Sequence, residues 1–191
     1  MSIPAVVPLT LEVANLFCGK SPTDVSYSLH LKLAGIKLPF FEEHYVDHRP
    51  GGCPVALEVD MIFNRLQCTF SILGYDGSVY ETIRAWSDDQ NWFFFYGLLR
   101  DQQTGGFHKV EAQIKGRLGK VEPHEWEHGQ LFYTEGEIRG VIGYKLLISG
   151  DVVYDWNFEQ NRLQIGNVSQ SYPGTLTLQT NPAAIELVTP E

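Results

Sequence analysis

Apolar and polar residues alternate with a period of two along much of this chain. The pattern recurs at residues 9–14, 28–33, 57–64, 110–115 and 152–159. Successive side chains of a β-strand point to opposite faces of its sheet, so each segment predicts a strand with one core-facing side and one side towards water or a partner. The apolar positions of the second and third segments are Leu29, Leu31 and Leu33, and Leu57, Val59, Met61 and Phe63, with Ile62 out of step.

Local signals indicate how these strands are joined. Ser149-Gly150-Asp151 precedes the last alternating segment and predicts a tight hairpin. A capping box at Ser78 and Glu81 predicts one short helix that runs to Trp86. The aromatic run at 92–96 is too short for a helix and predicts a buried strand. We therefore expect a mostly β, single-domain antiparallel sandwich or barrel with one flanking helix.

Composition excludes several classes of function. The chain has 191 residues, 43% of them hydrophobic, which suffices for one well-buried domain. Its formal net charge of −9 argues against a protein that grips nucleic acid by neutralising phosphates. No apolar run approaches the ~20 residues that span a bilayer, and residues 1–4 lack the pattern of a signal peptide. Cysteines at 18, 53 and 68 have no recognised spacing, which predicts reduced thiols.

Four blocks of residues, taken in order, resemble one known family. They are Leu11–Phe17; Glu42–Tyr45 with Gly51-Gly52 and Pro54-Val55; Lys115–Arg117 followed by Gly129; and Tyr144–Leu146 with Gly150 and Asp155. In this order they resemble the major tail tube protein of contractile-tailed, P2-like bacteriophages and related tailocins. The C-terminal residues depart from that family, because 170–191 lack its usual glycine-aspartate turn and arginine-bearing helix.

The resemblance implies a structural virion protein rather than an enzyme. It divides the chain into a tail tube β domain at 1–168 and a C-terminal extension at 169–191. Six copies would close into a ring in which strands from every subunit form one hexameric inner barrel. Stacked rings would then make the hollow tube of a contractile tail, a conduit for DNA ejection. A tailocin or contractile injection system would use the same tube without DNA.

The family also implies partners and a location. We expect contacts with a tail sheath protein, a tape measure protein inside the tube, and baseplate and tail terminator proteins at its ends. DNA would pass transiently and without specific binding, and neither a membrane nor a cofactor is expected. The tube would be assembled in the host cytoplasm and end up in the virion.

Two sets of residues are candidates for the surfaces of such a tube. In the resembling proteins a long loop reaches the adjacent ring, and here it comprises Asp47, His48, Arg49, Pro50, Gly51, Gly52 and Cys53. The lumen-facing candidates are Glu58, Asp60, Glu111, Lys115, Glu135 and Glu137. An acidic lumen would repel phosphates and discourage lasting contact with DNA. The alternative is that these side chains lie on a solvated outer face.

Two readings of another class remain. His124-Glu125-x-x-His128 matches the zinc metalloprotease pattern, whose chemistry requires a helix that puts both histidines on one face. Pro123 and Gly129 leave room for little more than one helical turn, and the family resemblance makes this segment a loop between two strands. We therefore expect neither a metal site nor a catalytic residue.

The second reading is a carbohydrate-binding β sandwich. Its stacking platform would be built from the four tryptophans, Trp86, Trp92, Trp126 and Trp156. The opposing interpretation is that Trp86 and Trp156 belong to the core.

Overall fold

The computed structural model describes residues 8–21, 27–49, 51–52, 54–77, 79, 90–125, 127–166 and 168–171. This part of the chain forms twelve β-strands, and every recorded pairing between them is antiparallel. The strands are β1 (Leu9–Gly19), β2 (Tyr27–Ser28), β3 (Leu33–Lys37), β4 (Glu43–His48), β5 (Leu57–Phe63), β6 (Cys68–Leu73), β7 (Asn91–Asp101), β8 (Phe107–Pro123), β9 (Tyr133–Ile148), β10 (Asp151–Asn157), β11 (Arg162–Ile165) and β12 (Val168–Ser171). The predicted mostly β, antiparallel fold is confirmed.

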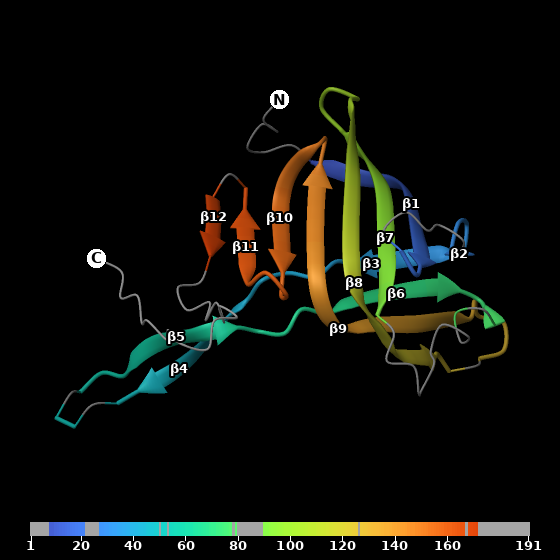
Figure 1. The fold of residues 1–191 in the computed structure, drawn as a ribbon. Coiled ribbons are helices and arrows are strands. Elements are labelled where there is room, and N and C mark those ends of the chain that lie inside the picture. The colour runs from blue at the N-terminus through green and yellow to red at the C-terminus, as the bar shows by residue number, and fades with distance from the viewer. Residues whose placement is uncertain are drawn as a thin grey trace, which may run out of the picture.

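Ten strands form one sheet that turns a corner at β8 and β9. Its main path is β12-β11-β10-β9-β8-β7-β1-β2, and β6 joins at β9 and carries β3 on its other side. The second half of β9 pairs with β10, whereas its first half pairs with β6. Figure 1 shows that β9 bends, so that its first half and β6 run across the direction of β7 and β10. We call β3, β6, residues 133–139 of β9 and residues 117–123 of β8 the crossing sheet, and the remainder of this path the main sheet.

The hydrophobic core lies between the two sheets. It contains Phe70 and Ile72 from β6, Phe93 and Phe95 from β7, Ile114 from β8, and Ile138 and Tyr144 from β9. The aromatic run at 92–96 thus lies within a buried strand, as predicted. The Phe70 ring occupies the space that a side chain at Gly136 would need, because a Cβ at this position would stand 2.3 Å from Phe70 Cζ. The close approach of β6 to β9 therefore depends on this glycine.

The bend in β9 has a visible cause in the backbone. Gly140 interrupts β9 with a φ of 56°, a conformation that glycine adopts without steric cost. Around it, the pairing of β8 with β9 shifts register twice, between Lys115 and Arg117 and between Leu118 and Lys120. Bulges bend a strand and increase its twist, so these irregularities let β8 and β9 belong to both sheets.

The hairpin between β9 and β10 is confirmed. Ser149 and Gly150 have φ values of 54° and 91°, which is the two-residue turn that matches the twist of antiparallel strands. By contrast, the strand predicted over residues 28–33 is wrong. It is broken by a turn in which Leu31 has a φ of 64° and is 86% exposed, while Leu29 is buried.

Three expectations about architecture need correction or lie outside the described residues. Within the described ranges the sheet does not close into a barrel, because β2, β3 and β12 remain edge strands. The helix predicted from Ser78 to Trp86 falls, apart from the buried Val79, outside the described residues. The boundary predicted at residue 168 remains a prediction, and β12 runs across it. No described helix is long and apolar enough to cross a membrane.

Candidate assembly surfaces

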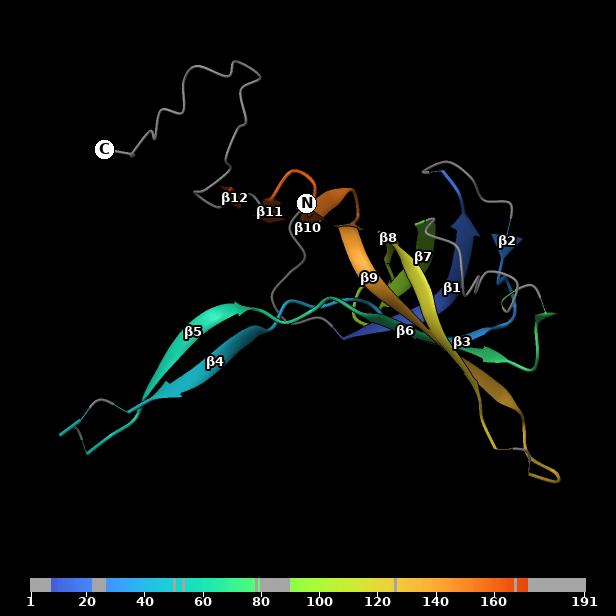
Figure 2. The same cartoon turned by 60° about the horizontal axis from the view of Figure 1, so that its bottom comes forward.

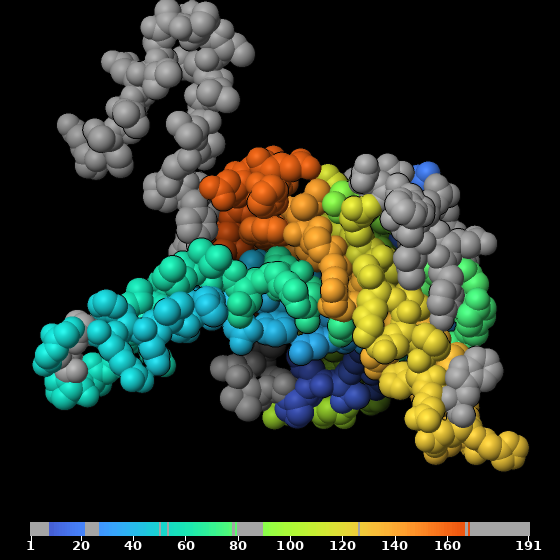
Figure 3. Space-filling model, turned by 90° about the horizontal axis from the view of Figure 1, so that it is seen from below, coloured from blue at the N-terminus to red at the C-terminus, as the bar shows by residue number. Residues whose placement is uncertain are grey.

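The β4–β5 hairpin is a two-stranded sheet that stands apart from the other ten strands. Its strands pair with each other from Glu43 opposite Phe63 to His48 opposite Leu57. Every residue of β4 is exposed, and in β5 only Phe63 is partly covered. Figures 2 and 3 show the hairpin projecting from one side of the body. At ~3.3 Å per residue, β5 alone reaches roughly 20 Å. A hairpin of this kind is marginally stable in water without further contacts.

One face of the hairpin is apolar. Val46 lies directly opposite Val59, and Leu57 and Met61 occupy the neighbouring alternate positions of β5. Leu57 and Met61 are each 61% exposed. The alternation in residues 57–63 was expected to bury one side in the core of this chain. That expectation is wrong for Leu57, Val59 and Met61, which are exposed. Only Phe63, at the base of the hairpin, contacts a ring that packs on the core, that of Phe41, with the two ring centroids 5.7 Å apart.

The other face of the hairpin is acidic. Asp47 lies directly opposite Glu58, and Tyr45 lies opposite Asp60, so Glu58 and Asp60 share a face as predicted. The Tyr45 hydroxyl donates a hydrogen bond to Glu43. This bond, together with the negative charges of Glu43, Asp60 and Glu58, raises the pKa of Tyr45 above its usual value. Like charges directly opposite each other destabilise a strand pair, so this face favours a positively charged neighbour.

The predicted inter-ring loop lies at the end of this hairpin. Asp47 and His48 are the last two residues of β4, and the turn that follows includes Gly51 and Gly52. Gly52 has a φ of 85°, which requires glycine. Pro50 and Cys53 lie outside the described residues. Whether this loop reaches another ring stays a prediction.

The outward face of the crossing sheet is polar and combines charges of both signs. Two rows of directly opposed residues run across its four strands: Lys37, Thr69, Glu137 and Lys120, and beside them Gly35, Ser71, Glu135 and Glu122. Arg139 donates a hydrogen bond to Glu137 over 2.6 Å and thereby lowers the pKa of this carboxyl. Lys120 forms an ion pair with Glu122. Most charges on this face are therefore neutralised by a neighbour.

The outward face of the main sheet holds the remaining two lumen candidates. Lys115 on β8 forms an ion pair with Glu159 over 3.1 Å and lies 5.8 Å from the ring centroid of Trp92. Glu111 lies four residues earlier on the same side of β8. The six lumen candidates are thus divided among three surfaces: Glu58 and Asp60 on the hairpin, Glu135 and Glu137 on the crossing sheet, and Glu111 and Lys115 on the main sheet.

The segment that matches the metalloprotease pattern connects β8 to β9 and is not helical where it is described. His124 follows the end of β8, and its backbone N–H donates to the carbonyl of Tyr133. Its ring Nε2 lies 2.9 Å from a carboxylate oxygen of Glu135. The described residues contain no group of three or more His, Cys, Asp or Glu side chains placed to hold a metal ion. The described residues of this segment thus lack the helical geometry that zinc hydrolysis requires.

The tryptophans do not form one platform where they are described. Trp156 packs against the core, consistent with the core interpretation, opposite Tyr144. Trp92 stands opposite Lys115 on the outward face and stacks on Phe94 with centroids 6.2 Å apart. These two side chains thus lie on opposite sides of the sheet. Trp86 and Trp126 lie outside the described residues.

Sequence reasoning missed two features of these surfaces. The first is the polar face of the crossing sheet, where Gly35, Thr69 and Ser71 stand beside the predicted glutamates. The second is a set of basic residues near the bend, including Arg117 and Lys145, which belong to the blocks that resemble the family but were not proposed as surface residues. Gly140, in the middle of a long alternating segment, was the available signal for a bend at this point.

Comparison with known proteins connects these surfaces to a family. A family model described as phage tail tube protein FII matches residues 26–171. No curated protein matched the sequence.

Three solved structures are similar in shape. One is a chain of the anti-feeding prophage baseplate, with 15% identity, a TM-score of 0.45, and coverage of 77% of this chain and 97% of that one. The others come from an extracellular contractile injection system in its extended state. A chain of its sheath–tube complex has 6% identity and a TM-score of 0.49, and the match covers 76% of this chain and 93% of that one. A chain of its sheath/tube terminator has 6% identity and a TM-score of 0.48, and the match covers 75% of this chain and 98% of that one.

Proposed function

The chain belongs to the phage tail tube protein FII family and is a structural tail tube protein, and we propose that it assembles as stacked hexameric rings into the hollow inner tube of a contractile tail. The tube is a conduit for DNA ejection. In this role the chain works through the surfaces that it presents to other copies of itself, not through an active site.

The observation that carries this proposal is the unsupported β4–β5 hairpin. Leu57 and Met61 expose apolar side chains on β5, which pairs only with β4 in the described chain. Burying apolar surface stabilises a contact by ~25 cal/mol per Å², so a projecting apolar hairpin gains most of its stability from a neighbour. A neighbouring copy is always available in a tube, and the repeated contact propagates without closing on itself.

The edges of the crossing sheet support ring closure. Residues 33–37 pair on one side with β6, and residues 117–123 of β8 pair on one side with β9. The other edges of both segments have no strand partner in the described chain. Exposed edges offer unpaired backbone N–H and C=O groups. In the proposed ring, β3 of one copy pairs with residues 117–123 of the next, so that six crossing sheets form one continuous inner barrel.

This closure gives the outward face of the crossing sheet to the lumen. Of the candidate charges along the chain, Glu135 and Glu137 therefore line the lumen, beside the small side chains of Thr69 and Ser71. Arg139 and Lys120 are held by carboxylates, which neutralises part of the positive charge that passing phosphates would meet. Glu58, Asp60, Glu111 and Lys115 belong to other surfaces. The predicted tip at Asp47–Cys53 reaches the adjacent ring.

Family membership is the support for the remaining partners. The outside of the tube faces a tail sheath protein, its interior holds a tape measure protein, and baseplate and terminator proteins contact its ends. The tube is assembled in the host cytoplasm and is part of the virion. A DNA-free tailocin tube is the second candidate, since the same surfaces serve both particles.

The test uses a hairpin variant of the purified chain. Negative-stain electron microscopy and sedimentation are expected to show rings or hollow tubes for the wild-type chain. Leu57→Ser combined with Met61→Ser should abolish assembly without unfolding the chain, because both side chains are already exposed. Phe107→Ser is the control, since Phe107 is 59% exposed at the start of β8. A wild-type chain that stays monomeric at every concentration would overturn the proposal.

A further inference from the structure

The outward face of the crossing sheet does not share the negative charge of the whole chain. Its strands carry four basic side chains and three carboxylates: Lys37, Arg117, Lys120 and Arg139 against Glu122, Glu135 and Glu137. With four positive and three negative groups this face is positive by one charge per copy, whereas the chain has a formal net charge of −9. The excess of acidic residues therefore lies on other surfaces, and the charge of the whole chain does not describe how this face treats a polyanion.

Pairing within this face leaves Arg117 without a carboxylate. Each of the three carboxylates already lies beside another basic side chain, namely Lys120, His124 or Arg139. Lys37 lies 5.0 Å from the ring centroid of Phe40. Arg117 is partly exposed and forms no ion pair in the described part of the chain. Its guanidinium, which has five N–H donors, is thus available to an anion from outside the chain.

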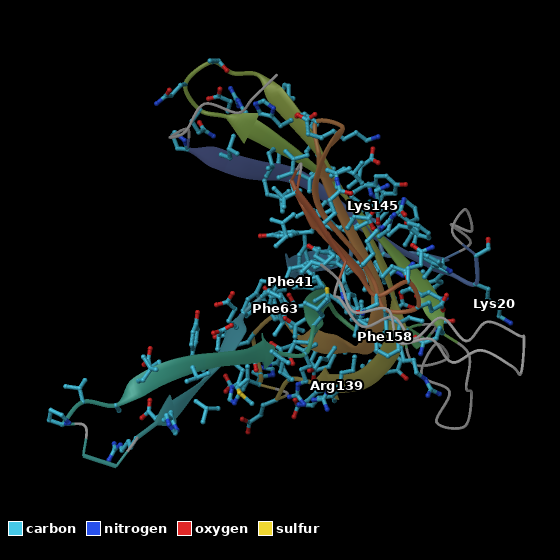
Figure 4. The ribbon with its side chains drawn as sticks, turned by 60° about the vertical axis from the view of Figure 1, so that its left-hand side comes forward. Lys20, Phe41, Phe63, Arg139, Lys145 and Phe158 are labelled. Carbon is cyan, nitrogen blue, oxygen red and sulfur yellow. The ribbon has the colours of Figure 1, made fainter. Side chains whose placement is uncertain are left out.

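The bend explains how two arginines can stand side by side. Arg117 lies directly opposite Arg139, where like charges repel each other. A Cβ at Gly119 would stand 3.2 Å from both Cβ and Cδ of Arg139, so the Arg139 side chain lies over this glycine and reaches Glu137 over 2.6 Å. Figure 4 shows Arg139 on the side of the crossing sheet that faces away from the main sheet. Arg117 shares this side, because directly opposed residues of a strand pair lie on the same face.

We infer that Arg117 of the six copies forms an arginine ring in the lumen that binds phosphates of double-stranded DNA. This inference rests on the proposed hexameric tube, since only ring closure puts six copies of Arg117 at one level. The planar guanidinium presents a fork of donors that matches two oxygens of a phosphate. A duplex carries one negative charge per ~1.7 Å of its axis, so phosphates pass every level of the tube whatever the base sequence. An acidic polypeptide has no such regular spacing of charge.

The contact between the arginine ring and DNA is weak and independent of sequence. Phosphate contacts carry no sequence information, and they allow a duplex to slide. Glu135 and Glu137 lie on the same face and repel phosphates, which limits how tightly each ring can hold the duplex. The arginine ring therefore slows DNA once per ring of the stack without stopping it.

Nuclease protection tests the arginine ring in assembled tubes. Tubes are formed with a short fluorescent DNA duplex at low salt, pelleted, and treated with nuclease to digest DNA bound outside. Tubes of Arg117→Gln should protect at least about fivefold less DNA than wild-type tubes, and binding should depend less steeply on salt, because fewer counterions are released. Glu135→Gln removes a carboxylate from the same face, so its tubes should protect at least about twofold more DNA. The matched control is Arg100→Gln, which removes a positive charge from an exposed residue of β7 outside the crossing sheet and should leave protection unchanged.

The outcomes separate the arginine ring from the tube itself. If either Arg117→Gln or Glu135→Gln forms tubes that protect as much DNA as wild-type tubes, the arginine ring is refuted while the tube remains. Glu135→Gln gives this answer even if Arg117→Gln does not assemble. Protection of fluorescent polyglutamate in place of the duplex would overturn DNA as the partner. A wild type that forms no tubes in negative-stain images counts against the proposed function.

Discussion

Replacing Gly136 with alanine should destabilise the chain by forcing two strands apart. The added Cβ would lie 2.3 Å from Phe70 Cζ and 2.7 Å from both Cε atoms, closer than real Cβ contacts allow. Phe70 is 4% exposed and belongs to the core, so its ring has no free space to enter. Overpacking of a well-packed core costs about 1–3 kcal/mol. A chain of this size loses roughly 2–4 °C in Tm per kcal/mol, so Gly136→Ala should melt roughly 2–12 °C below the wild type.

The assay is thermal unfolding of the unassembled chain, followed by circular dichroism. Gly51→Ala is the control, because a Cβ there meets nothing within 4 Å. Phe70→Leu in the Gly136→Ala background should recover part of the loss, since the two positions are in contact and their effects are then not additive. The packing argument is refuted if Gly136→Ala melts within 1 °C of the wild type. It is also refuted if Phe70→Leu lowers the Tm of the Gly136→Ala variant by as much as it lowers the Tm of the wild type.

Three further predictions concern single side chains. Leu31→Asn should raise the stability of the unassembled chain by up to about 1 kcal/mol, because asparagine tolerates the positive φ of 64° better than leucine does. A Tm of the variant below that of the wild type would contradict this. Burial raises the pKa of the Cys68 thiol to about 12, so this thiol should resist maleimide at pH 8 until the chain unfolds. Mass spectrometry measures the labelling, and rapid labelling of Cys68 in the native chain would count against its burial. The hydrogen bond from Arg139 lowers the pKa of Glu137 below its ordinary 4.5, so its contribution to stability is present above pH 4.5 and is lost as pH falls further. Glu137→Gln should therefore lose less stability in acid than the wild type does, and identical acid profiles would contradict the role of Arg139.

The sequence predicted several of the strands, but it predicted neither the break at residues 28–33 nor what covers the strands. Alternation at 110–115 and 152–159 correctly predicted β8 and β10, and Ser149-Gly150 correctly predicted the turn before β10. The same alternation at 57–63 gives an apolar face that this chain does not bury. A period of two reports that one face is apolar, but it carries no information on whether the covering partner belongs to the same chain.

The candidate site shows a similar limit. Glu135 and Glu137 were singled out from the spacing of charges along one strand, and the structure adds Thr69 and Ser71 from β6 beside them. Such neighbours come from pairing between segments about 65 residues apart, which a local pattern cannot specify. The separation of Glu135 and Glu137 from Glu111 and Lys115 follows from the bend at Gly140, where this glycine was the one available signal, and the register shifts between β8 and β9 beside it were not predicted.

The most direct test of the tube is an end-on view of the assembled chain. Negative-stain images of the purified protein, averaged along the axis of the particles, should show a hollow ring with six-fold symmetry. Side views should show rings stacked at a constant spacing. Compact monomers, solid particles without a lumen, or a ring of a different order would contradict the hexameric tube.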